Sequence, residues 1–561
     1  MRLSIAAAAA LAALMVPSAP SHAARPNVLV LETDDQTLES MSVMPNVRRL
    51  LGQRGTTFDR SFVSFSLCCP SRATLFTGQY AHNHGVLGNA PPIGGYTKLD
   101  KSEWLPLWLQ RAGYRTVHLG KFLNGYGRDS PPTEVPPGWS EWYGSVDPTT
   151  YRYYGYTLNE NGILRTYGAD GNPAFYQTDF YARRAVGLVA RLAPERQPFF
   201  LSVAFLAPHT GRPRESDDPR MATPVPAPRH RNRFAALPLP RPPSFDEADV
   251  SDKPLNVRRR SRIGARGQAA IQENYQQRLE SLLAVDDAVA AIVAELRRSR
   301  ELDDTLIVFT SDNAFFHGEH RVRNGKILVY EPSIRVPLIL RGPGVPRGAR
   351  RRQLVTNADL APTILRAARA RPRRVQDGRS LFPLLDDPGR EWGRDLLIEG
   401  NAGANGTFDA LRTYRYVYVE YANGERELYD LRSDPFQLQS RHADPRYAAV
   451  RAQLARRLAA LQTCRGRACR RRPRLRLATR PRRRCVRRFV RARVVGRDRR
   501  SVSRADFIVR GRRLARDRRA PFAKRVRIRR VRRGRRFRFR ARVSTGDGRV
   551  VTLDRRLRRC A

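Results

Sequence analysis

The segment Val28-Leu29-Val30-Leu31, which leads into Asp34-Asp35, gives the first indication of the fold. A short apolar run that ends at polar residues is typical of a strand buried on both faces of a sheet. Four more runs follow: residues 114–119 before Gly120-Lys121, 199–205 before Pro208-His209, 305–310 before Asp312-Asn313, and 336–340. Their repetition predicts a sheet of several buried strands.

Helical patterns lie between these runs, at residues 44–52, 105–112, 179–192 and 268–300. Buried strands that alternate with amphipathic helices predict an α/β fold, in which helices cover both faces of a mostly parallel sheet. Ligands bind to such folds beyond the carboxyl ends of the strands. We therefore expect the polar residues that follow the strands to share one pocket.

Changes in composition divide the chain into five segments: a signal peptide at 1–23, a large α/β domain at 24–395, a small α+β subdomain at 396–463, a basic linker at 464–484, and an Arg-rich β-sandwich-like module at 485–561. In the subdomain, Asn423-Gly424 predicts a hairpin turn, and a helix is expected at 445–463. Residues 213–262, rich in Pro and Arg, are predicted to form a surface excursion, as a lid or rim.

The first residues have the parts of a signal peptide. Arg2 is basic, residues 3–16 are apolar, and Ser21-His22-Ala23 is a small-x-Ala cleavage pattern. We therefore expect a secreted or cell-envelope protein, with an N-terminal anchor helix as the alternative. No internal stretch is long and apolar enough to predict a membrane span.

The charge is concentrated at the C-terminal end. The formal net charge is +52, and the segment from Cys464 to Ala561 contains 42 Lys and Arg against five Asp. Apolar residues alternate with Arg in this segment, which favours short strands over the alternative of a disordered basic tail. Such a module is expected to attract polyanions at low salt, and export argues against a specific nucleic-acid partner.

Four of the six cysteines lie in the basic region. In an exported protein we prefer the pairs Cys464–Cys469 and Cys485–Cys560 among three connectivities. A zinc site is the rival interpretation, but Cys-x4-Cys without a nearby His is poor zinc spacing. Cys68 and Cys69 remain unpaired.

Two polar pairs suggest a metal site. Asp34 and Asp35 follow one predicted strand, and Asp312 and Asn313 follow another. Three carboxylates and an amide oxygen suit Ca²⁺ or Mg²⁺. A single Asp pair at a strand end is often only a helix cap, but two pairs at matching ends favour the metal site.

The most specific segment is Cys68-Cys69-Pro70-Ser71-Arg72-Ala73-Thr74-Leu75-Phe76-Thr77-Gly78. Pro70 and Gly78 predict the start and the end of a short helix. Cys68 would lie at the helix N-terminus, where free N–H groups favour an oxyanion, and Arg72 can add a charge-assisted contact. From the residues alone, Cys68 could be either a reactive thiolate or an inert buried thiol.

This segment resembles the signature of the formylglycine-dependent sulfatases, with Phe76 where the family usually has Leu or a similar residue. The resemblance covers most of residues 26–390. It implies an alkaline-phosphatase-like fold and oxidation of Cys68 to formylglycine by a formylglycine-generating enzyme. It also implies Ca²⁺, with Mg²⁺ as the alternative ion, and a sulfated carbohydrate or aryl sulfate as substrate. The implied metal ligands are Asp34, Asp35, Cys68, Asp312 and Asn313, and the implied catalytic residues are Cys68, Arg72, Lys121, His209 and Lys326.

One departure from the general pattern indicates a subgroup. Many sulfatases have a histidine two residues after the Gly-Lys lysine, where this chain has Leu123. The sequence Gly120-Lys121-Phe122-Leu123-Asn124-Gly125-Tyr126 is instead similar to N-acetylglucosamine-6-sulfatases and extracellular heparan endosulfatases. The similarity implies a sugar 6-O-sulfate as the substrate.

The resemblance also implies a mechanism. The cations would neutralise sulfate oxygens in the transition state, Asp35 would help to activate the nucleophile, and His209 or Lys326 would protonate the leaving alcohol. Taken singly, His209 is more often structural, and Lys121 and Lys326 are more often surface groups. Yet the chain has only six lysines, so their retention at these positions favours a functional role.

Other interpretations stay open. His317, Glu319 and His320 are pocket candidates, with loop packing as the alternative, and the Tyr-rich residues 151–156 could stack on sugars or pack in strands. A phosphodiesterase or phosphonate monoester hydrolase of the same fold is a second enzyme class. A polyanion-binding secreted protein is a third hypothesis, in which the basic module is the active part.

Overall fold

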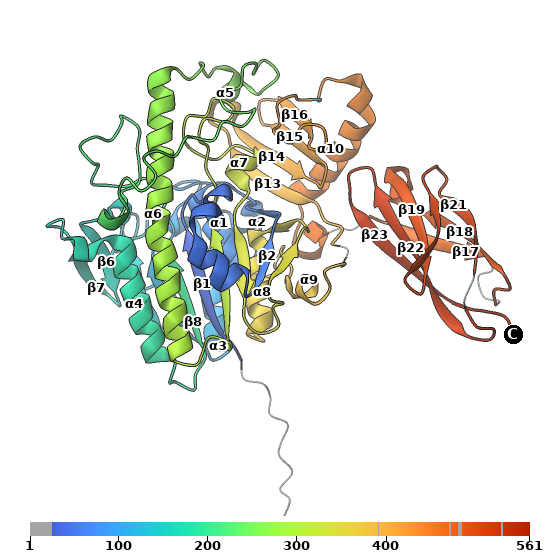
Figure 1. Cartoon of the computed structure of the whole chain (residues 1–561), viewed down its shortest axis with the longest axis horizontal. Helices are drawn as coiled ribbons and strands as arrows, with labels where there is room; N and C mark the ends of the chain where they lie inside the picture. The colour runs from blue at the N-terminus through green and yellow to red at the C-terminus, as the bar shows by residue number, and fades with distance from the viewer. Residues whose placement is uncertain (1–24, 391, 471–472, 481–484, 529–530) are drawn as a thin grey trace, which may run out of the picture.

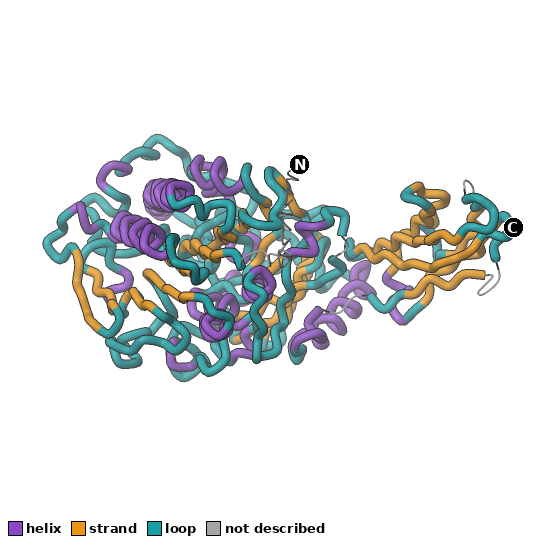
Figure 2. The backbone as a smooth tube through the Cα atoms, turned by 90° about the horizontal axis from the view of Figure 1, so that it is seen from below, coloured by secondary structure: helices purple, strands orange, loops and turns teal. Residues whose placement is uncertain are grey.

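The computed structural model describes residues 25–561 except 391, 471–472, 481–484 and 529–530. The predicted signal peptide lies outside the described residues. Figure 1 shows a large body of sheet and helices, with a smaller β-lobe at one side that contains the C-terminus. Figure 2 shows the same separation from a second direction.

A ten-stranded sheet forms the centre of the large body. Its strands lie in the order β11 (Ala349–Arg351), β2 (Thr56–Phe58), β10 (Leu338–Arg341), β9 (Thr305–Ser311), β1 (Asn27–Thr33), β8 (Phe199–Ala204), β4 (Arg115–Gly120), β5 (Glu141–Ser145), β6 (Tyr156–Glu160) and β7 (Ile163–Tyr167). The run from β9 to β5 is parallel throughout. The α/β prediction is therefore confirmed.

Strand β10 differs from the parallel arrangement. It pairs antiparallel with both β9 and β2. The apolar run at 336–340 was predicted correctly as a strand, but its carboxyl end lies at the opposite edge from the polar groups. Because the side-chain period of a strand does not depend on its direction, apolar spacing could not reveal this reversal.

Helices bury both faces of the sheet. Leu29 and Leu31 of β1 belong to a core with α4 (Gln177–Leu192) and α6 (Ala265–Arg298). Val28 and Val30 face the other way, into a core that includes α1 (Cys68–Thr77), α3 (Leu105–Arg111) and α8 (Leu360–Ala367). In the described part of the chain, no helix has the length and apolar character of a membrane span.

The strand order brings the predicted polar groups together. Strands β9, β1, β8 and β4 are consecutive and parallel, so the residues after each strand meet at one edge. Gly120, the last residue of β4, has a φ of +104°, and a Cβ at this position would lie 2.1 Å from the carbonyl oxygen of Ala204. Glycine therefore allows the backbone to approach β8 and turn Lys121 into the site.

A second, antiparallel sheet follows the large domain. It consists of β13 (Leu396–Asn401), β14 (Thr407–Arg412), β15 (Tyr416–Tyr421) and β16 (Arg426–Asp430), in that order. The predicted hairpin joins β15 to β16. Helix α10 (Ala448–Gln462) covers one face, and the other packs against the large domain.

The C-terminal lobe is a sandwich of two antiparallel sheets. One contains β17 (Arg476–Arg480), β18 (Phe489–Val495) and β21 (Ala523–Arg527); the other contains β20 (Arg512–Asp517), β19 (Val502–Val509), β22 (Arg536–Thr545) and β23 (Val550–Arg558). Disulfides join Cys464 to Cys469 and Cys485 to Cys560. The β-sandwich prediction is confirmed, but the segment 464–484 is more than the predicted linker.

The segment that we predicted as a linker contributes β17 to the sandwich. Leu477 of β17 is buried in the sandwich core, and Arg480 pairs in register with Arg491 of β18. This strand has only two buried positions, Leu477 and Thr479, so its alternating pattern is too short to stand out among arginines.

Charged residues join the lobe to the large body. The Nε of Arg457, on α10, lies 2.8 Å from Asp395, and the same guanidinium bonds Asp547 of the lobe. Arg549 of the lobe lies 3.5 Å from Asp395. Asp395, Asp547 and Arg549 are buried, so the lobe is held by a shared network in addition to the chain connection.

Candidate active site

Helix α1 places Cys68 at the centre of the site. Leu67 before it is extended, and Gly78 ends the helix with a φ of +68°, as the sequence predicts. Every residue of α1 is buried, and Cys68 is 1% exposed. The helix therefore presents its N-terminus to the polar edge of the sheet. The N–H groups there are largely used: that of Cys69 donates to Asn89 Oδ1 at 3.0 Å, that of Ser71 donates to the carbonyl of Leu67, and Pro70 has none.

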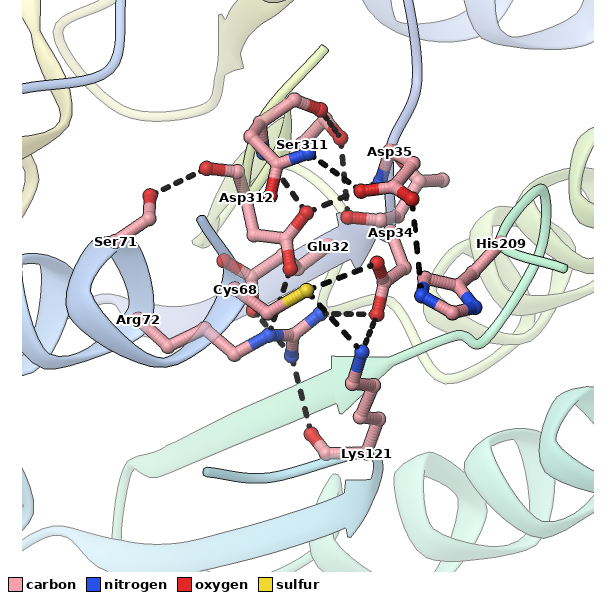
Figure 3. A network of polar contacts seen from close by, with 12 residues as sticks. Glu32, Asp34, Asp35, Cys68, Ser71, Arg72, Lys121, His209, Ser311 and Asp312 are labelled. Atoms are coloured by element: carbon pink, nitrogen blue, oxygen red, sulfur yellow. Dashed lines mark hydrogen bonds and ion pairs between the residues drawn. The ribbon is translucent and has the colours of Figure 1, made fainter. Parts of the chain in front are cut away.

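Two lysines and a carboxylate surround the sulfur of Cys68, and Figure 3 shows Lys121 and Asp34 beside it. The Sγ atom lies 2.8 Å from Lys326 Nζ, 3.5 Å from Lys121 Nζ and 3.6 Å from Asp34 Oδ1. Burial, together with Asp34, raises the pKa of the Cys68 thiol far above its usual value, and the two lysines offset this only in part. An unmodified Cys68 would therefore stay protonated and be a poor nucleophile.

Three carboxylates converge beside Cys68. Oxygen atoms of Asp34, Asp35 and Asp312 all lie within 4.8 Å of one another, and all three side chains are at most 2% exposed. The Oδ1 of Asn313, next to them, is buried without a hydrogen-bond partner. Converging carboxylates and an unpaired amide oxygen fit a hard divalent cation, since such ions take oxygen ligands.

A second group overlaps the first. Asp34, Cys68 and His209 also offer ligand atoms within 4.8 Å of one another. A mixed set of oxygen, sulfur and nitrogen would suit a softer metal. The ammonium groups of Lys121 and Lys326 contact members of both groups, so the donor atoms decide: three carboxylates carry more negative charge and offer only the oxygen ligands that Ca²⁺ or Mg²⁺ takes. The three-carboxylate group is therefore the better metal site.

The guanidinium of Arg72 forms ion pairs with three buried carboxylates. Its Nε lies 2.9 Å from Asp312, its Nη1 lies 2.9 Å from Glu32, and its Nη2 lies 3.3 Å from Asp34. We expected Arg72 to contact the oxyanion directly. The geometry instead supports a positioning role, because the guanidinium holds two candidate metal ligands and is itself 1% exposed.

Asp35 has a strained backbone and a strongly acidic side chain. Its φ of +67° lies in the left-handed region, and its N–H donates to Asp312 Oδ1 at 3.1 Å. Although burial opposes ionisation, Lys326 and His209 hold the pKa of Asp35 at about 2. Strain of this kind costs about 1–3 kcal/mol and persists mainly where function requires it.

The remaining predicted catalytic residues reach the same point from two strand ends and a loop. Lys121 follows β4, and its ammonium group bonds Asp34. His209 follows β8, and its Nε2 lies 3.7 Å from Asp35 Oδ2. Lys326 bonds Asp35 from the loop before α7 (Glu331–Ile334). The structure therefore brings together all the predicted catalytic and metal-binding residues.

The additional pocket candidates lie elsewhere. His320 Nδ1 lies 2.6 Å from Glu247, and its ring stacks on Tyr330 at 4.0 Å. Glu319 accepts a hydrogen bond from the backbone N–H of His317. These contacts favour loop packing.

The Tyr-rich segment divides between the site and the core. The ring of Tyr151 lies 4.8 Å from Lys121 Nζ and 5.0 Å from the ring of His209. Tyr153 and Tyr156 are fully buried in the core. Tyr151 alone therefore fits the predicted role beside a substrate.

Sequence reasoning missed two buried groups. Glu32 lies at the end of β1 and bridges to Arg72, and burial raises its pKa to about 7 even though Arg72 opposes the shift. Arg278, on α6, donates to the backbone carbonyl of Asp35 and lies over Phe315 at 3.9 Å. Glu32 had a visible signal, since it is a charged residue directly after the apolar run of β1. Arg278 had none, because one arginine among many on a long helix is not distinctive.

Two family models match the sequence. A sulfatase model matches residues 26–370, and a model of the C-terminal part of N-sulphoglucosamine sulphohydrolase matches residues 318–464. An arylsulfatase of Volvox carteri is 33% identical over 499 residues, covering 79% of this chain and 76% of its own. Human N-acetylglucosamine-6-sulfatase is 31% identical over 493 residues, covering 80% and 86%.

A putative extracellular sulfatase Sulf-1 homolog of Caenorhabditis elegans is 33% identical over 365 residues, and the match spans 49% of that protein. Among solved structures, one in complex with its substrate D-glucosamine-2-N,6-O-disulfate has a TM-score of 0.66 at 24% identity and covers 78% of this chain and 97% of its own. The phosphonate monoester hydrolase of Agrobacterium radiobacter has a TM-score of 0.60 at 23% identity, covering 78% and 95%. At these identities the structures establish a shared fold.

Proposed function

The chain belongs to the sulfatase family, and from that premise we propose that it removes sulfate from a sulfated amino sugar with a nucleophile made from Cys68. It is an enzyme that hydrolyses sulfate esters, and it is similar to N-acetylglucosamine-6-sulfatases. The observation that carries the proposal is the position of Cys68, at a buried helix N-terminus between two lysines and the carboxylate cluster.

The nucleophile is formylglycine, made from Cys68 by a formylglycine-generating enzyme. The high pKa of the unmodified thiol supports this proposal, because a protonated, buried thiol attacks sulfur poorly. When hydrated, the aldehyde supplies two hydroxyl groups on one carbon, one to attack sulfur and one to expel sulfate afterwards.

A divalent cation, Ca²⁺ or alternatively Mg²⁺, would be held by Asp34, Asp35, Asp312 and Asn313, beside residue 68, and would polarise a sulfate oxygen. Lys121 and Lys326 direct their ammonium groups to the same point and would bind the sulfate oxygens as charge shifts in the transition state. Arg72 would hold Asp34 and Asp312 in place.

His209 is the better candidate for protonating the leaving alcohol. Its side chain is 18% exposed, against 12% for Lys326 and 2% for Lys121, so it lies closest to the solvent side from which a sugar would enter. Both lysines also contact the nucleophile position. We therefore assign the acid role to His209. Burial lowers the pKa of His209, and the nearby carboxylates of Asp34 and Asp35 offset this shift in part and favour the protonated ring that an acid needs.

Replacing His209 by Gln should depend on the leaving group. We expect a loss of about 10²–10³-fold in kcat/KM for a sugar sulfate, whose alcohol must be protonated, and a loss below about tenfold for 4-nitrophenyl sulfate. His230→Gln is the matched control, because His230 pairs with Asp287 on the surface. Equal losses on both substrates would remove the acid role from His209.

The substrate is a sulfated sugar, and a 6-O-sulfated glucosamine is favoured. Two observations support this choice: several relatives are named N-acetylglucosamine-6-sulfatase, and a neighbour of the same fold binds a 6-O-sulfated glucosamine. The ring of Tyr151, beside Lys121 and His209, could support a sugar ring.

A phosphonate monoester hydrolase is the second candidate, since two neighbours of this fold have that activity. We expect the purified protein, with Ca²⁺ present, to hydrolyse 4-nitrophenyl sulfate at least about tenfold faster than the corresponding phenylphosphonate ester. If the phosphonate ester were cleaved faster, phosphonate monoester hydrolase would become the first candidate function. No release of sulfate from any aryl or sugar sulfate would refute the proposal.

The protein acts outside the cytoplasm, in the medium or the cell envelope. Relatives named extracellular sulfatases support this placement, as does the signal-peptide pattern that ends at Ala23.

A further inference from the structure

One face of the C-terminal lobe is covered with arginine. In the three-stranded sheet, alternate residues such as Leu477, Val490 and Val526 are buried in the sandwich core, so the residues between them point outward. The outward residues include six exposed arginines, which we call the arginine face: Arg476 and Arg480 on β17, Arg491 and Arg493 on β18, and Arg525 and Arg527 on β21.

Three of these arginines form a row across the sheet. Arg480 lies directly opposite Arg491, and Arg491 lies directly opposite Arg525. Neighbouring strands are about 4.8 Å apart, so the row spans about 10 Å. Like charges directly opposite one another destabilise a sheet. The row therefore makes folding less favourable unless an anion covers it.

No acid offsets this charge within the described structure. The arginine face has no ion-pair partner among the described residues, and the five Asp of the region lie elsewhere: Asp498 and Asp517 accept from backbone N–H groups, and Asp506, Asp547 and Asp554 pair with other arginines. The face is thus a concentrated and uncompensated positive surface.

The outer face of the four-stranded sheet is different. There, Asp506 lies 3.2 Å from Arg504 and 2.6 Å from Arg516, and Asp554 lies 3.1 Å from Arg540. Its positive charge is therefore neutralised in part, although Arg538 and Arg556 also lie directly opposite one another.

That second face is also partly covered. Arg540, Val550 and Thr552 line a cavity together with Asp387 and Arg390 of the large domain. A long polymer would therefore find less open surface there than on the arginine face.

The arginine face also offers an apolar ring. Phe489 of β18 is half-buried, and the guanidinium of Arg525 lies 4.1 Å from its ring centre. The ring therefore holds the Arg525 guanidinium at the surface, where it and the adjacent guanidiniums can bind anionic groups in pairs of hydrogen bonds, and a sugar ring could pack on Phe489 only if Arg525 moved aside. Charge and an aromatic ring on one flat face suit a charged carbohydrate.

We propose that the arginine face is a docking surface for a linear sulfated polysaccharide. The choice of this polymer over a nucleic acid rests on the proposed function, because the same chain would hydrolyse sulfate esters of sugars. Docking keeps the polymer near the enzyme and raises its effective concentration at the active site.

The test compares two triple variants of equal charge in the full-length protein. Cys68→Ala is included in each, so that the probe, a heparin oligosaccharide of defined length, is not altered. The first variant is R480Q/R491Q/R525Q, and the matched control is R536Q/R538Q/R556Q, which removes exposed arginines from the other sheet. Binding is measured by calorimetry at several salt concentrations.

Compared with the Cys68→Ala protein that keeps all its arginines, we expect the first variant to bind heparin at least about tenfold more weakly and with a shallower dependence on salt. The affinity of the control should stay within about threefold of that reference. Equal losses in the two variants would mean diffuse attraction and would overturn the proposal, as would full binding by the first variant. Equally tight binding of a double-stranded DNA of matched charge would overturn the choice of polysaccharide.

Arg491→Glu separates binding from folding. A glutamate at this position would lie between Arg480 and Arg525 and convert repulsion into attraction, so the unfolding temperature of the lobe should rise while heparin binding falls. A fall in both would point to a damaged lobe and contradict the like-charge account. Because binding is measured without turnover, a protein with Cys68 intact that docks heparin but releases no sulfate would refute the proposed function alone.

Discussion

Replacing Cys68 by Ala or Ser should reduce the steady-state hydrolysis of 4-nitrophenyl sulfate by about 10⁴-fold or more, because the nucleophile is lost or cannot be regenerated. The two variants should differ in the first turnover. A serine hydroxyl can attack sulfur once, but it has no second hydroxyl on the same carbon to expel sulfate. Cys68→Ser should therefore release up to one nitrophenol per active site and no free sulfate, whereas Cys68→Ala should release neither.

Cys69→Ala is the matched control for this experiment. Cys69 is fully buried in the apolar core and lies next to Cys68 on α1, but its sulfur is not part of the carboxylate and lysine cluster. We expect the variant to keep its activity within a few-fold and to lose about 1 kcal/mol of stability from the smaller side chain. If Cys69→Ala were as inactive as Cys68→Ala, the nucleophile would be wrongly assigned.

Asp312→Asn should make the enzyme lose its response to the metal. In the unaltered protein, Ca²⁺ at 100 times its Kd should raise the free energy of unfolding by about 2.7 kcal/mol, and a chelator should remove most of the activity. The variant replaces a charged ligand that also holds Arg72. We expect it to lose the thermal shift at the same Ca²⁺ concentration and to retain less than about 1% of the activity.

The control for the metal experiment is Asp506→Asn, which removes a carboxylate from the C-terminal lobe. It should keep both the thermal shift and the activity. Comparing Ca²⁺ with Mg²⁺ in the same assay identifies the preferred ion. Full activity after chelation would show that turnover does not require a metal ion at the carboxylate cluster.

Much of the site could be predicted because the carboxyl ends of parallel strands lie at the same edge of a sheet. Asp34, Lys121, His209 and Asp312 are far apart in the sequence, but each follows a strand of one parallel run, and such ends meet at one edge. The apolar runs were long enough to mark the strands. In a parallel sheet these ends share one edge whatever the strand order, and the resemblance supplied the chemistry.

The remainder depended on pairings that the sequence does not mark. The reversal of β10 left no trace in its apolar spacing, and β17 is a short strand whose place depends on pairing with β18. The positioning role of Arg72 could not be inferred either, because its partner Glu32 lies on a different element and has only a single charge as its signal. Long-range contacts between single polar residues are the least visible in a sequence.

The central claim is that residue 68 carries an aldehyde in the active enzyme. The direct measurement is the mass of the peptide that contains Cys68, taken from protein whose turnover has been determined. We expect the mass of formylglycine, in a fraction that matches the active fraction of the preparation. An intact thiol at Cys68 in fully active protein would contradict the account.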